Sequence, residues 1–257
     1  MPGFGRIRAS RARRDDEGNA LRIFEEEERR AWRSWPSKRA KVSRRGTSTY
    51  GGSVAETPFE RLDAAVRRIG EYVERRPPPG VSHDDADDTV GTIGCDEAFG
   101  FDPLVLLAAL DRHGARAVVI GQVAGIMHGS QELTGDVDLL WRGEPSEAPK
   151  FAAAFADVGA SLFDDEHRPL PLDTGSFALP KLLFQSAGAS GDCCTPQLPW
   201  GSLDVAGIIE RADAASVGGV TVHYASLTDL VAMRQASARP KDVRRAAELC
   251  ELALRGR

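Results

Sequence analysis

The sequence predicts an α/β or α+β domain, with a small mixed β-sheet flanked by helices, C-terminal helices and a helical or disordered N-terminal extension. Three short apolar segments, 115–121, 137–141 and 220–225, have the length and residue types of buried strands. Helical patterns lie between and after them, yet strands and helices do not alternate as a regular βαβ repeat. This combination is typical of a mixed sheet covered by helices.

Charge divides the chain into three regions. Residues 1–50 carry 14 Lys and Arg against 7 Asp and Glu, although the whole chain has a net charge of −5. We therefore expect a basic, flexible arm over residues 1–54 and an acidic body after it. Such an arm is typical either of a solvated tail or of a nucleic-acid contact. Residues 55–100 are expected to form a helix and an acidic linker, and residues 101–257 the main domain.

A capped amphipathic helix is predicted over residues 57–76. Thr57 occupies the N-cap position, Pro58 lies in the first turn, and Glu60 completes a capping box. The motif RPPPG ends the helix. Its apolar stripe consists of Leu62, Ala65, Val66, Ile69 and Val73.

The composition predicts a cytoplasmic protein that does not cross a membrane. No apolar run approaches the roughly 20 residues that a bilayer span needs. The basic N-terminus has no apolar stretch behind it, as a secretory signal would have. The cysteines lack CxxC spacing and the density of a disulfide scaffold, so we expect reduced thiols at Cys95, Cys193, Cys194 and Cys250.

The remaining elements of the main domain follow from apolar periodicity and from glycine, proline and cap residues. We expect the segment GDCCTPQLP, around residues 191–199, to be a loop between two strands. Helices are predicted over 102–114, 122–130, 145–160, 226–237 and 240–256, and further strands over 161–165, 181–188 and 201–208.

Asp136 and Asp138 stand one residue apart in TGDVDLLW, at the start of a predicted strand. Because successive strand residues point to opposite faces, both carboxylates would lie on one face. Like charges this close repel each other and raise each other's pKa. A hard divalent cation such as Mg²⁺ prefers oxygen ligands and removes the repulsion. Since a carboxylate pair can bridge two metal ions about 3.5–4 Å apart, we predict a site for two magnesium ions.

Two further features support a phosphate-handling site. Asp204 in GSLDV is a single acid in an apolar stretch predicted to be a strand, where it would supply a third carboxylate. Gly121 lies at a strand-to-helix junction 15 residues (136 − 121) before Asp136. Free backbone N–H groups at such a junction bind phosphate oxygens.

The segment VVIGQVAGIMHGSQELTGDVDLLW resembles the signature of the nucleotidyltransferase superfamily with the polymerase-beta-like fold. More narrowly, it resembles the AbiEii-type toxin branch, whose pattern is GG-x-A, then HG, then R-x-T-x-D-x-D. The stretch TPQLPWGSLDVAG is similar to that branch's strand with the third acid, and VTVHYASLTDLVAMRQASARPKD to its C-terminal pattern. The resemblance covers residues 102–255 in the right order.

The resemblance implies roles for individual residues. Asp136 and Asp138 would hold magnesium and the nucleoside triphosphate, and Asp204 would bind a metal and help deprotonate the attacking hydroxyl. Gly121, with the backbone of Gln122, would lie against the phosphates.

Several other positions have two interpretations each. Lys241 either reaches the substrate or only begins a helix, and Lys181 either neutralises the triphosphate or is an ordinary strand-edge lysine. Ser130 is a further candidate for nucleotide binding, and we interpret His128 as a structural residue that positions Ser130 and its turn.

Two positions depart from the family pattern. Gln122 replaces a glycine or serine of the phosphate turn, so its side chain would either crowd the γ-phosphate or supply an amide donor. Glu132 replaces an arginine and reverses the charge near the metal site, which would weaken the attraction for a nucleotide.

The predicted function is magnesium-dependent transfer of a nucleoside monophosphate from an NTP to an acceptor hydroxyl. The toxin branch implies an RNA acceptor such as tRNA and an antitoxin protein as partner. The alternatives are transfer to a small, antibiotic-type hydroxyl compound, which the acidic body would favour if that compound is cationic, and a degenerate domain that binds a nucleotide or a partner without turnover.

Overall fold

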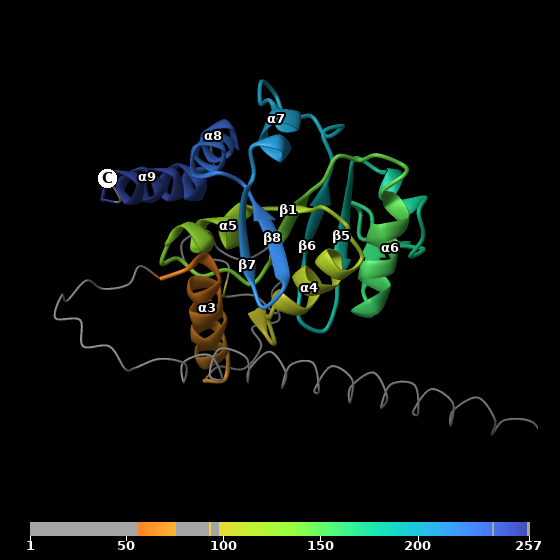
Figure 1. Cartoon of the computed structure of the whole chain (residues 1–257), viewed down its shortest axis with the longest axis horizontal. Helices are drawn as coiled ribbons and strands as arrows, with labels where there is room; N and C mark the ends of the chain where they lie inside the picture. Colours follow the sequence, from red (N-terminus) through yellow and green to blue (C-terminus); the bar gives the residue numbers. More distant parts are fainter. Residues whose placement is uncertain (1–55, 76–92, 94–97, 238, 256–257) are drawn as a thin grey trace, which may run out of the picture. The chain divides into compact units, whose positions relative to one another are not determined.

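An eight-stranded mixed sheet forms the centre of the fold (Figure 1). The structure is a computed structural model, and it describes residues 56–75, 93, 98–237 and 239–255. The strands lie in the order β4-β3-β5-β6-β2-β1-β8-β7. Their bounds are Val118–Ile120 (β1), Asp138–Leu140 (β2), Ser161–Phe163 (β3), Pro169–Leu170 (β4), Lys181–Gln185 (β5), Ser190–Cys194 (β6), Asp213–Val217 (β7) and Val220–Tyr224 (β8).

The sheet contains both parallel and antiparallel pairs. Strand β2 runs parallel to β6, and β1 runs parallel to β8. The other neighbouring pairs are antiparallel. This mixture confirms the predicted fold class, a mixed sheet flanked by helices.

Helices pack around the sheet in groups (Figure 1). Helix α4 packs against α6 and β8, α3 against α5 and β7, and α8 against α9. Helix α5, which follows β1 directly, also contacts both α8 and α9. The helices are Pro58–Val73 (α3), Leu104–Arg112 (α4), Gly121–His128 (α5), Ala148–Asp157 (α6), Val205–Glu210 (α7), Leu227–Ser237 (α8) and Pro240–Arg255 (α9), with a 3₁₀ turn at Ser176–Ala178.

An aromatic cluster fills the core between α6 and one face of the sheet. Phe151 and Phe155 lie four residues apart on α6, so both point from the same side of that helix. Phe151 packs 4.4 Å from Trp141, measured between ring centroids, and Phe155 packs 5.0 Å from Phe184 of β5. Because strand residues alternate, the neighbour of Phe184, Leu183, points to the opposite face. That opposite face carries the candidate site.

Helix α3 confirms the predicted capping box. The Thr57 side chain accepts a hydrogen bond from the Glu60 backbone N–H at 3.2 Å, and the Glu60 carboxylate accepts one from the Thr57 N–H at 2.8 Å. Leu62 and Ile69 of the predicted stripe are fully buried. Since α3 packs against α5, it belongs to the same compact unit, residues 54–257, as the main domain.

Two predictions about the segment between β5 and α7 are wrong. GSLDV is not a strand, because Asp204 caps α7 and its carboxylate accepts a hydrogen bond from the Gly207 N–H at 3.0 Å. The GDCC segment is not a loop but the last four of the five residues of β6. Glycine and aspartate are unusual in strands, and here β6 tolerates Asp192 because that side chain faces a cavity. Strands β4 and β7 were not predicted.

Several predictions concern residues outside the described ranges. The basic arm over 1–54, the greater part of the linker over 76–97 and Cys95 belong to this group. Within the part of the chain that the structure describes, no helix is both long and apolar enough to cross a membrane.

Candidate functional site

A cavity of about 970 Å³ opens on the sheet face opposite the aromatic core. This volume is at the upper end of the range for small-molecule sites. Six of the eight sequence-predicted site residues line it: Gly121, Gln122, Asp136, Asp138, Lys181 and Lys241. The structure therefore brings together residues that are up to 120 positions (241 − 121) apart in the sequence.

Strand register places a row of side chains across the floor of this cavity. Asp138 pairs with Ile120 of β1, and the next residue, Leu139, pairs with Cys193 of β6. Asp138 therefore lies beside Asp192, which precedes Cys193. Asp192 in turn pairs with Leu183 of β5, and Leu183 pairs with Phe163 of β3. The row Phe163–Leu183–Asp192–Asp138–Ile120 thus crosses five neighbouring strands.

Asp138 is the most strongly perturbed carboxyl of the site. It is half-buried, with its open side toward the cavity, and this burial raises its pKa well above the usual range. The negative charges of Asp136 and Asp192 raise the pKa further, whereas Arg234 and Arg239 oppose the shift. At Asp138 the neighbouring carboxylates thus act in the direction that the sequence predicted, although burial is the larger cause of the raised pKa.

Gly121 allows a close approach between the junction of β1 with α5 and the Asp138 side chain. Its φ of +63° lies in the left-handed region that glycine adopts without strain. A Cβ at this position would lie 1.9 Å from the Asp138 Oδ2 atom. The junction between β1 and α5 is therefore packed directly against the Asp138 carboxylate. Only glycine at position 121 leaves room for that carboxylate.

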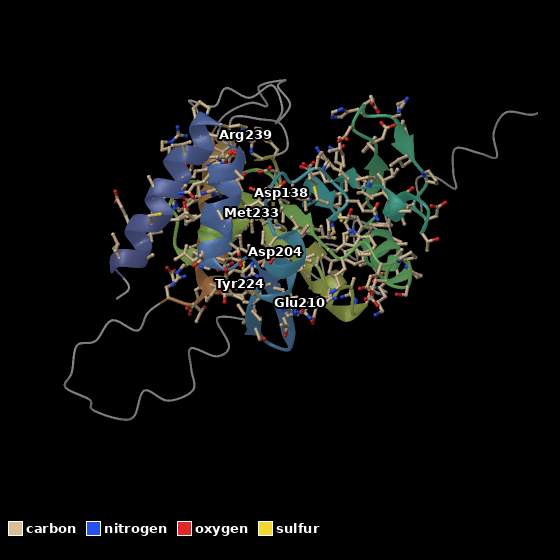
Figure 2. The ribbon with its side chains drawn as sticks, turned by 90° about the horizontal axis from the view of Figure 1, so that it is seen from above. Asp138, Asp204, Glu210, Tyr224, Met233 and Arg239 are labelled. Carbon is tan, nitrogen blue, oxygen red and sulfur yellow. The ribbon has the colours of Figure 1, made fainter. Side chains whose placement is uncertain are left out.

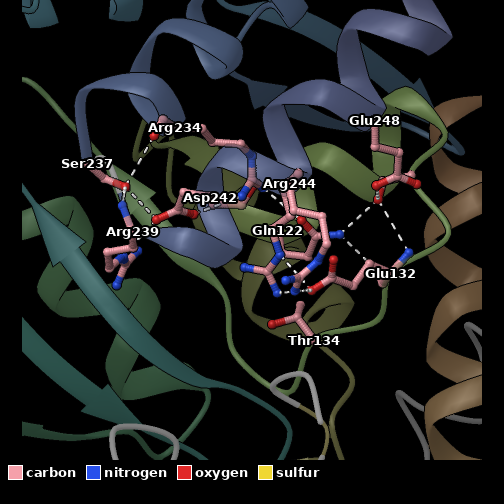
Figure 3. Close-up of polar contacts among 12 residues, drawn as sticks. Gln122, Glu132, Thr134, Arg234, Ser237, Arg239, Asp242, Arg244 and Glu248 are labelled. Carbon is pink, nitrogen blue, oxygen red and sulfur yellow. Dashed lines mark hydrogen bonds and ion pairs between the residues drawn. The ribbon is translucent and has the colours of Figure 1, made fainter. Parts of the chain in front are cut away.

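The side chain of Gln122 is part of a buried polar network and does not lie loose in the cavity (Figure 3). Its Nε2 donates to the Ser130 Oγ at 2.9 Å and to the Glu132 carbonyl at 2.8 Å. Its Oε1 accepts from the Arg234 Nη2 at 2.8 Å, and the same Nη2 donates to the Gly121 carbonyl at 2.9 Å. Gln122 thereby joins the Gly121 turn to α8. Both predicted effects, crowding a phosphate and donating to it, would require this network to open.

Glu132 has a structural role as well. Its Oε1 accepts from the Arg245 Nε at 2.7 Å, and an Arg244 nitrogen lies 3.9 Å from the same oxygen (Figure 3). Glu132 does not line the cavity. The negative charge of Glu132 is therefore paired with cations of α9 and lies off the cavity.

Buried ion pairs extend this network along α8 and α9. Arg234 is 4% exposed and donates through Nη1 to the Asp242 Oδ1 at 3.2 Å. Asp242, 5% exposed, also accepts from the exposed Arg239 Nε at 2.6 Å and from the Ser237 Oγ at 2.5 Å. Arg234, Arg239, Lys241 and Arg245 line the cavity together with Asp242, so this side of it carries a net positive charge.

Three sequence-predicted residues lie elsewhere or act differently. Asp204 is not on the cavity. It caps α7 at the exposed surface (Figure 2). Its carboxylate pairs with Arg211 at 3.1 Å. Ser130 is also outside the cavity, where its Oγ donates to Glu248 at 2.7 Å. Lys181 lines the cavity and pairs with Asp192 at 3.1 Å, so its nearest anion is a site carboxylate.

His128 is a structural residue of α5. Its Nε2 lies 2.8 Å from the Ala225 carbonyl, and its ring packs 5.0 Å from Tyr224. Burial lowers its pKa, and Arg61 lowers it further, whereas the bond to Ala225 and the charge of Asp213 oppose the shift. His128 therefore fastens α5 to the end of β8.

Comparison with known proteins adds no family. No protein-family model matches the chain. No curated protein matches its sequence significantly. The functional argument therefore rests on the residues of the cavity and on the motif resemblance.

Sequence reasoning missed Asp192 and Arg234. Asp192 was hidden in a segment with loop-like composition, although a lone acid directly before two buried cysteines could have been interpreted as a strand residue facing a site. Arg234 lies on a helix whose sequence has no clear apolar stripe, so its burial depends on the contact with Gly121 and Gln122.

The carboxylates form a donor set that suits magnesium. Asp136, Asp138 and Asp192 offer only oxygen ligands, and their mutual repulsion is relieved by a divalent cation. Within the described residues, no group of three or more Asp, Glu, His or Cys side chains is placed so that it could by itself hold a metal ion. Magnesium does not require such a cage, because it keeps several water ligands and is held by one or two carboxylates together with substrate phosphates.

Proposed function

We propose that the protein is a magnesium-dependent nucleotidyltransferase, which moves a nucleoside monophosphate from an NTP to an acceptor hydroxyl. The observation that carries this proposal is the packing of the Gly121 turn directly onto the Asp138 carboxylate, in a cavity that also holds Asp136 and Asp192. A phosphate-binding turn and a set of acids within one substrate-sized cavity are what nucleotidyl transfer needs.

The roles of the carboxylates follow from their positions. Asp136 and Asp138 would hold Mg²⁺, which when bound neutralises phosphate charge and polarises the α-phosphate. We assign the third carboxylate to Asp192 in place of Asp204, since Asp192 lies beside Asp138 and Asp204 caps a surface helix. Asp192 would accept the proton of the attacking hydroxyl. The hydroxyl oxygen forms a bond to the α-phosphorus, the bond from that phosphorus to pyrophosphate breaks, and pyrophosphate leaves with the electron pair.

The basic side of the cavity suits the leaving group. Arg239 and Lys241 stand near the N-terminus of α9, and the buried Arg234 contacts the carbonyl of Gly121. Positive charge here would stabilise the negative charge that develops on the pyrophosphate. The triphosphate would then run from the carboxylates toward α8 and α9.

A degenerate, non-catalytic domain is the less favoured alternative. Its main support was the pair of departures at Gln122 and Glu132. Both side chains are satisfied by hydrogen bonds or ion pairs within the fold. The departures therefore supply no reason for loss of activity.

The experiment is a transfer assay with each α-labelled NTP, Mg²⁺ and a mixture of acceptors that includes total tRNA and small hydroxyl compounds. We expect label in one acceptor, with release of pyrophosphate, and loss of at least about 100-fold in Asp138→Asn and Asp192→Asn. Asp204→Asn is the matched control, because it makes the same chemical change at the α7 cap and should retain activity. Absence both of transfer to every acceptor and of Mg²⁺-dependent NTP binding would refute the proposal.

A further inference from the structure

The cavity continues beyond the carboxylates, away from α8 and α9. There its floor is formed by β6, β5 and β3, and Leu183 and Phe163 extend the row that starts at Asp138. Both side chains are half-buried and line the cavity. His167 and Gln185 line its outer part. This second part of the cavity, which we call the strand side, is an apolar platform next to the acids.

We call the part of the cavity that α8 and α9 line the helical side. The strand side carries the opposite charge from the helical side. Among the described lining residues, Lys181 is its only lysine or arginine. The Lys181 Nζ lies 3.1 Å from Asp192 and 3.3 Å from Asp165, so two carboxylates share its charge. The arginines of the lining, Arg234, Arg239 and Arg245, all belong to the α8–α9 region.

The hairpin above the platform adds further negative charge. Residues 161–173, which contain β3 and β4, hold four carboxylates and one arginine, Arg168. Arg168 pairs with Asp164 at 2.6 Å and with Glu166 at 2.8 Å. Asp165 is 58% exposed and lies 3.3 Å from Lys181 of the lining, and its neighbour in the chain, Glu166, is 68% exposed, so both carboxylates face solvent. A ligand that arrives here meets a net negative field.

In-line displacement decides which substrate uses which side. The attacking oxygen and the leaving oxygen lie on opposite sides of the α-phosphorus. If pyrophosphate leaves toward the basic helical side, the acceptor must approach from the strand side. We propose that the acceptor is a small hydroxyl compound bearing an amine, bound with an apolar ring face on Phe163 and Leu183 and its cation toward Asp165 and Glu166.

This assignment rests on the proposed function and selects among its acceptors. RNA is a polyanion, and proteins bind its backbone through lysine and arginine. The strand side offers Lys181 already engaged with two carboxylates, together with an acidic rim. A cationic compound gains from the same field, and the ring face of a sugar packs on an aromatic side chain at little cost in ordering.

The test compares three acceptors with the full-length protein, labelled NTP and Mg²⁺: an aminoglycoside trisaccharide, the neutral trisaccharide raffinose, and total tRNA. We expect label in the aminoglycoside, little in raffinose and none in tRNA. Binding of the aminoglycoside alone is measured in parallel by titration calorimetry, so that the site is tested independently of turnover.

Charge variants locate the site. Asp165→Asn and Glu166→Gln should each raise the KM for the aminoglycoside about 2- to 5-fold, the range for one exposed charge, with the KM for NTP unchanged. Glu166→Gln leaves the pairs of Lys181 intact and thus separates the rim charge from an effect on that lysine. Phe163→Ala should raise the same KM about 10-fold through lost packing area. Glu71→Gln on α3 removes an equal exposed charge away from the cavity and should change nothing.

The outcomes separate this inference from the proposed function. Label in tRNA but not in the aminoglycoside would overturn the inference and leave the transferase standing. Aminoglycoside binding that weakens in Glu166→Gln, without transfer to any acceptor, would support the site and refute the transferase. An aminoglycoside that neither binds nor accepts label would overturn the inference.

Discussion

The two sides of the cavity are built in different ways. On the helical side, charged groups are buried and interlocked, and Arg234 and Asp242 are only 4% and 5% exposed. On the strand side, the pairs of Arg168 with Asp164 and Glu166 lie near the surface, with Arg168 71% exposed, and Lys181 and Asp192 form a half-buried pair. Exposed pairs contribute little to stability, whereas loss of one partner from a buried pair is costly. The helical side therefore fixes the geometry of the site, and the strand side can change with little effect on folding.

The largest expected effect follows from disrupting the ion pairs behind the helical side. Glu132→Arg restores the family pattern but places an arginine against Arg245 and Arg244, so we expect a loss of about 3–5 kcal/mol in the free energy of unfolding. Chemical denaturation followed by circular dichroism measures this loss. Arg245→Glu added to Glu132→Arg reverses the pair and should recover most of the stability.

Arg168→Met is the comparison on the strand side, where we expect a loss of about 1 kcal/mol at most. Equal losses in Arg168→Met and Glu132→Arg would contradict the contrast between the two sides.

The next largest effect concerns the Gly121 turn, which lies between the helical side and the strand side of the cavity. Gly121→Ala places a methyl group at the position of the Asp138 carboxylate, so we expect transfer activity to fall at least about 100-fold, close to 3 kcal/mol in the barrier. Initial rates of label transfer measure it.

Gly114→Ala is a matched control, because Gly114 has the same φ of +63° and nothing within 4 Å of an added Cβ. It carries the same backbone strain without the clash and should keep its activity. An active Gly121→Ala enzyme would show that the close approach to Asp138 is not needed.

A smaller effect depends on pH, at the joint between α5 and β8. The pKa of His128 is lowered in the folded protein by burial, while an unfolded histidine titrates near 6.5. Above that pH both states are neutral and His128 contributes no pH dependence. Below it the unfolded state binds the proton more readily, so stability should fall by up to about 1.4 kcal/mol per pH unit.

Urea denaturation between pH 8 and pH 5 measures this slope. The variant His128→Gln removes the titrating group and should show a shallower decline over the same range. Parallel profiles for the two proteins would exclude His128 as the source.

The smallest effect concerns the surface helix α7. Asp204→Ala removes a cap that accepts the Gly207 N–H, which typically costs about 1 kcal/mol. Transfer activity should be unchanged, because Asp204 lies off the cavity. Thermal unfolding and the transfer assay together test both statements, and a large loss of activity without loss of stability would return Asp204 to the site.

Local patterns sufficed for much of the fold. The cap at Thr57, the apolar strand 118–120 and the glycine after α5 each depend on neighbours in sequence, and each was predicted from them. The pair Asp136 and Asp138 was found in the same way. Their union with Gly121 in one cavity depends on β1 and β2 being adjacent, which the sequence did not specify.

Features that depend on distant contacts were missed. Whether Asp192 or Asp204 lies beside Asp138 is decided by strand order and register, and neither can be read from composition. The roles of Gln122 and Glu132 likewise required the partners Arg234 and Arg245, more than 100 residues away. A departure from a motif therefore could not be judged without the side chains that face it.

The register of β6 also determines whether an oxygen or a sulfur ligand lies beside Asp138 in the proposed metal site. Sliding β6 by one residue would replace the Asp192 oxygen beside Asp138 with the sulfur of Cys193, exchanging a ligand suited to magnesium for one suited to zinc. Gly191 disfavours this shift of register, because a Cβ at its position would lie 2.1 Å from the Val137 carbonyl oxygen. Any other residue moved there would collide with the neighbouring backbone. Gly191 thus keeps an oxygen, and not a sulfur, beside Asp138, as the proposed magnesium site requires.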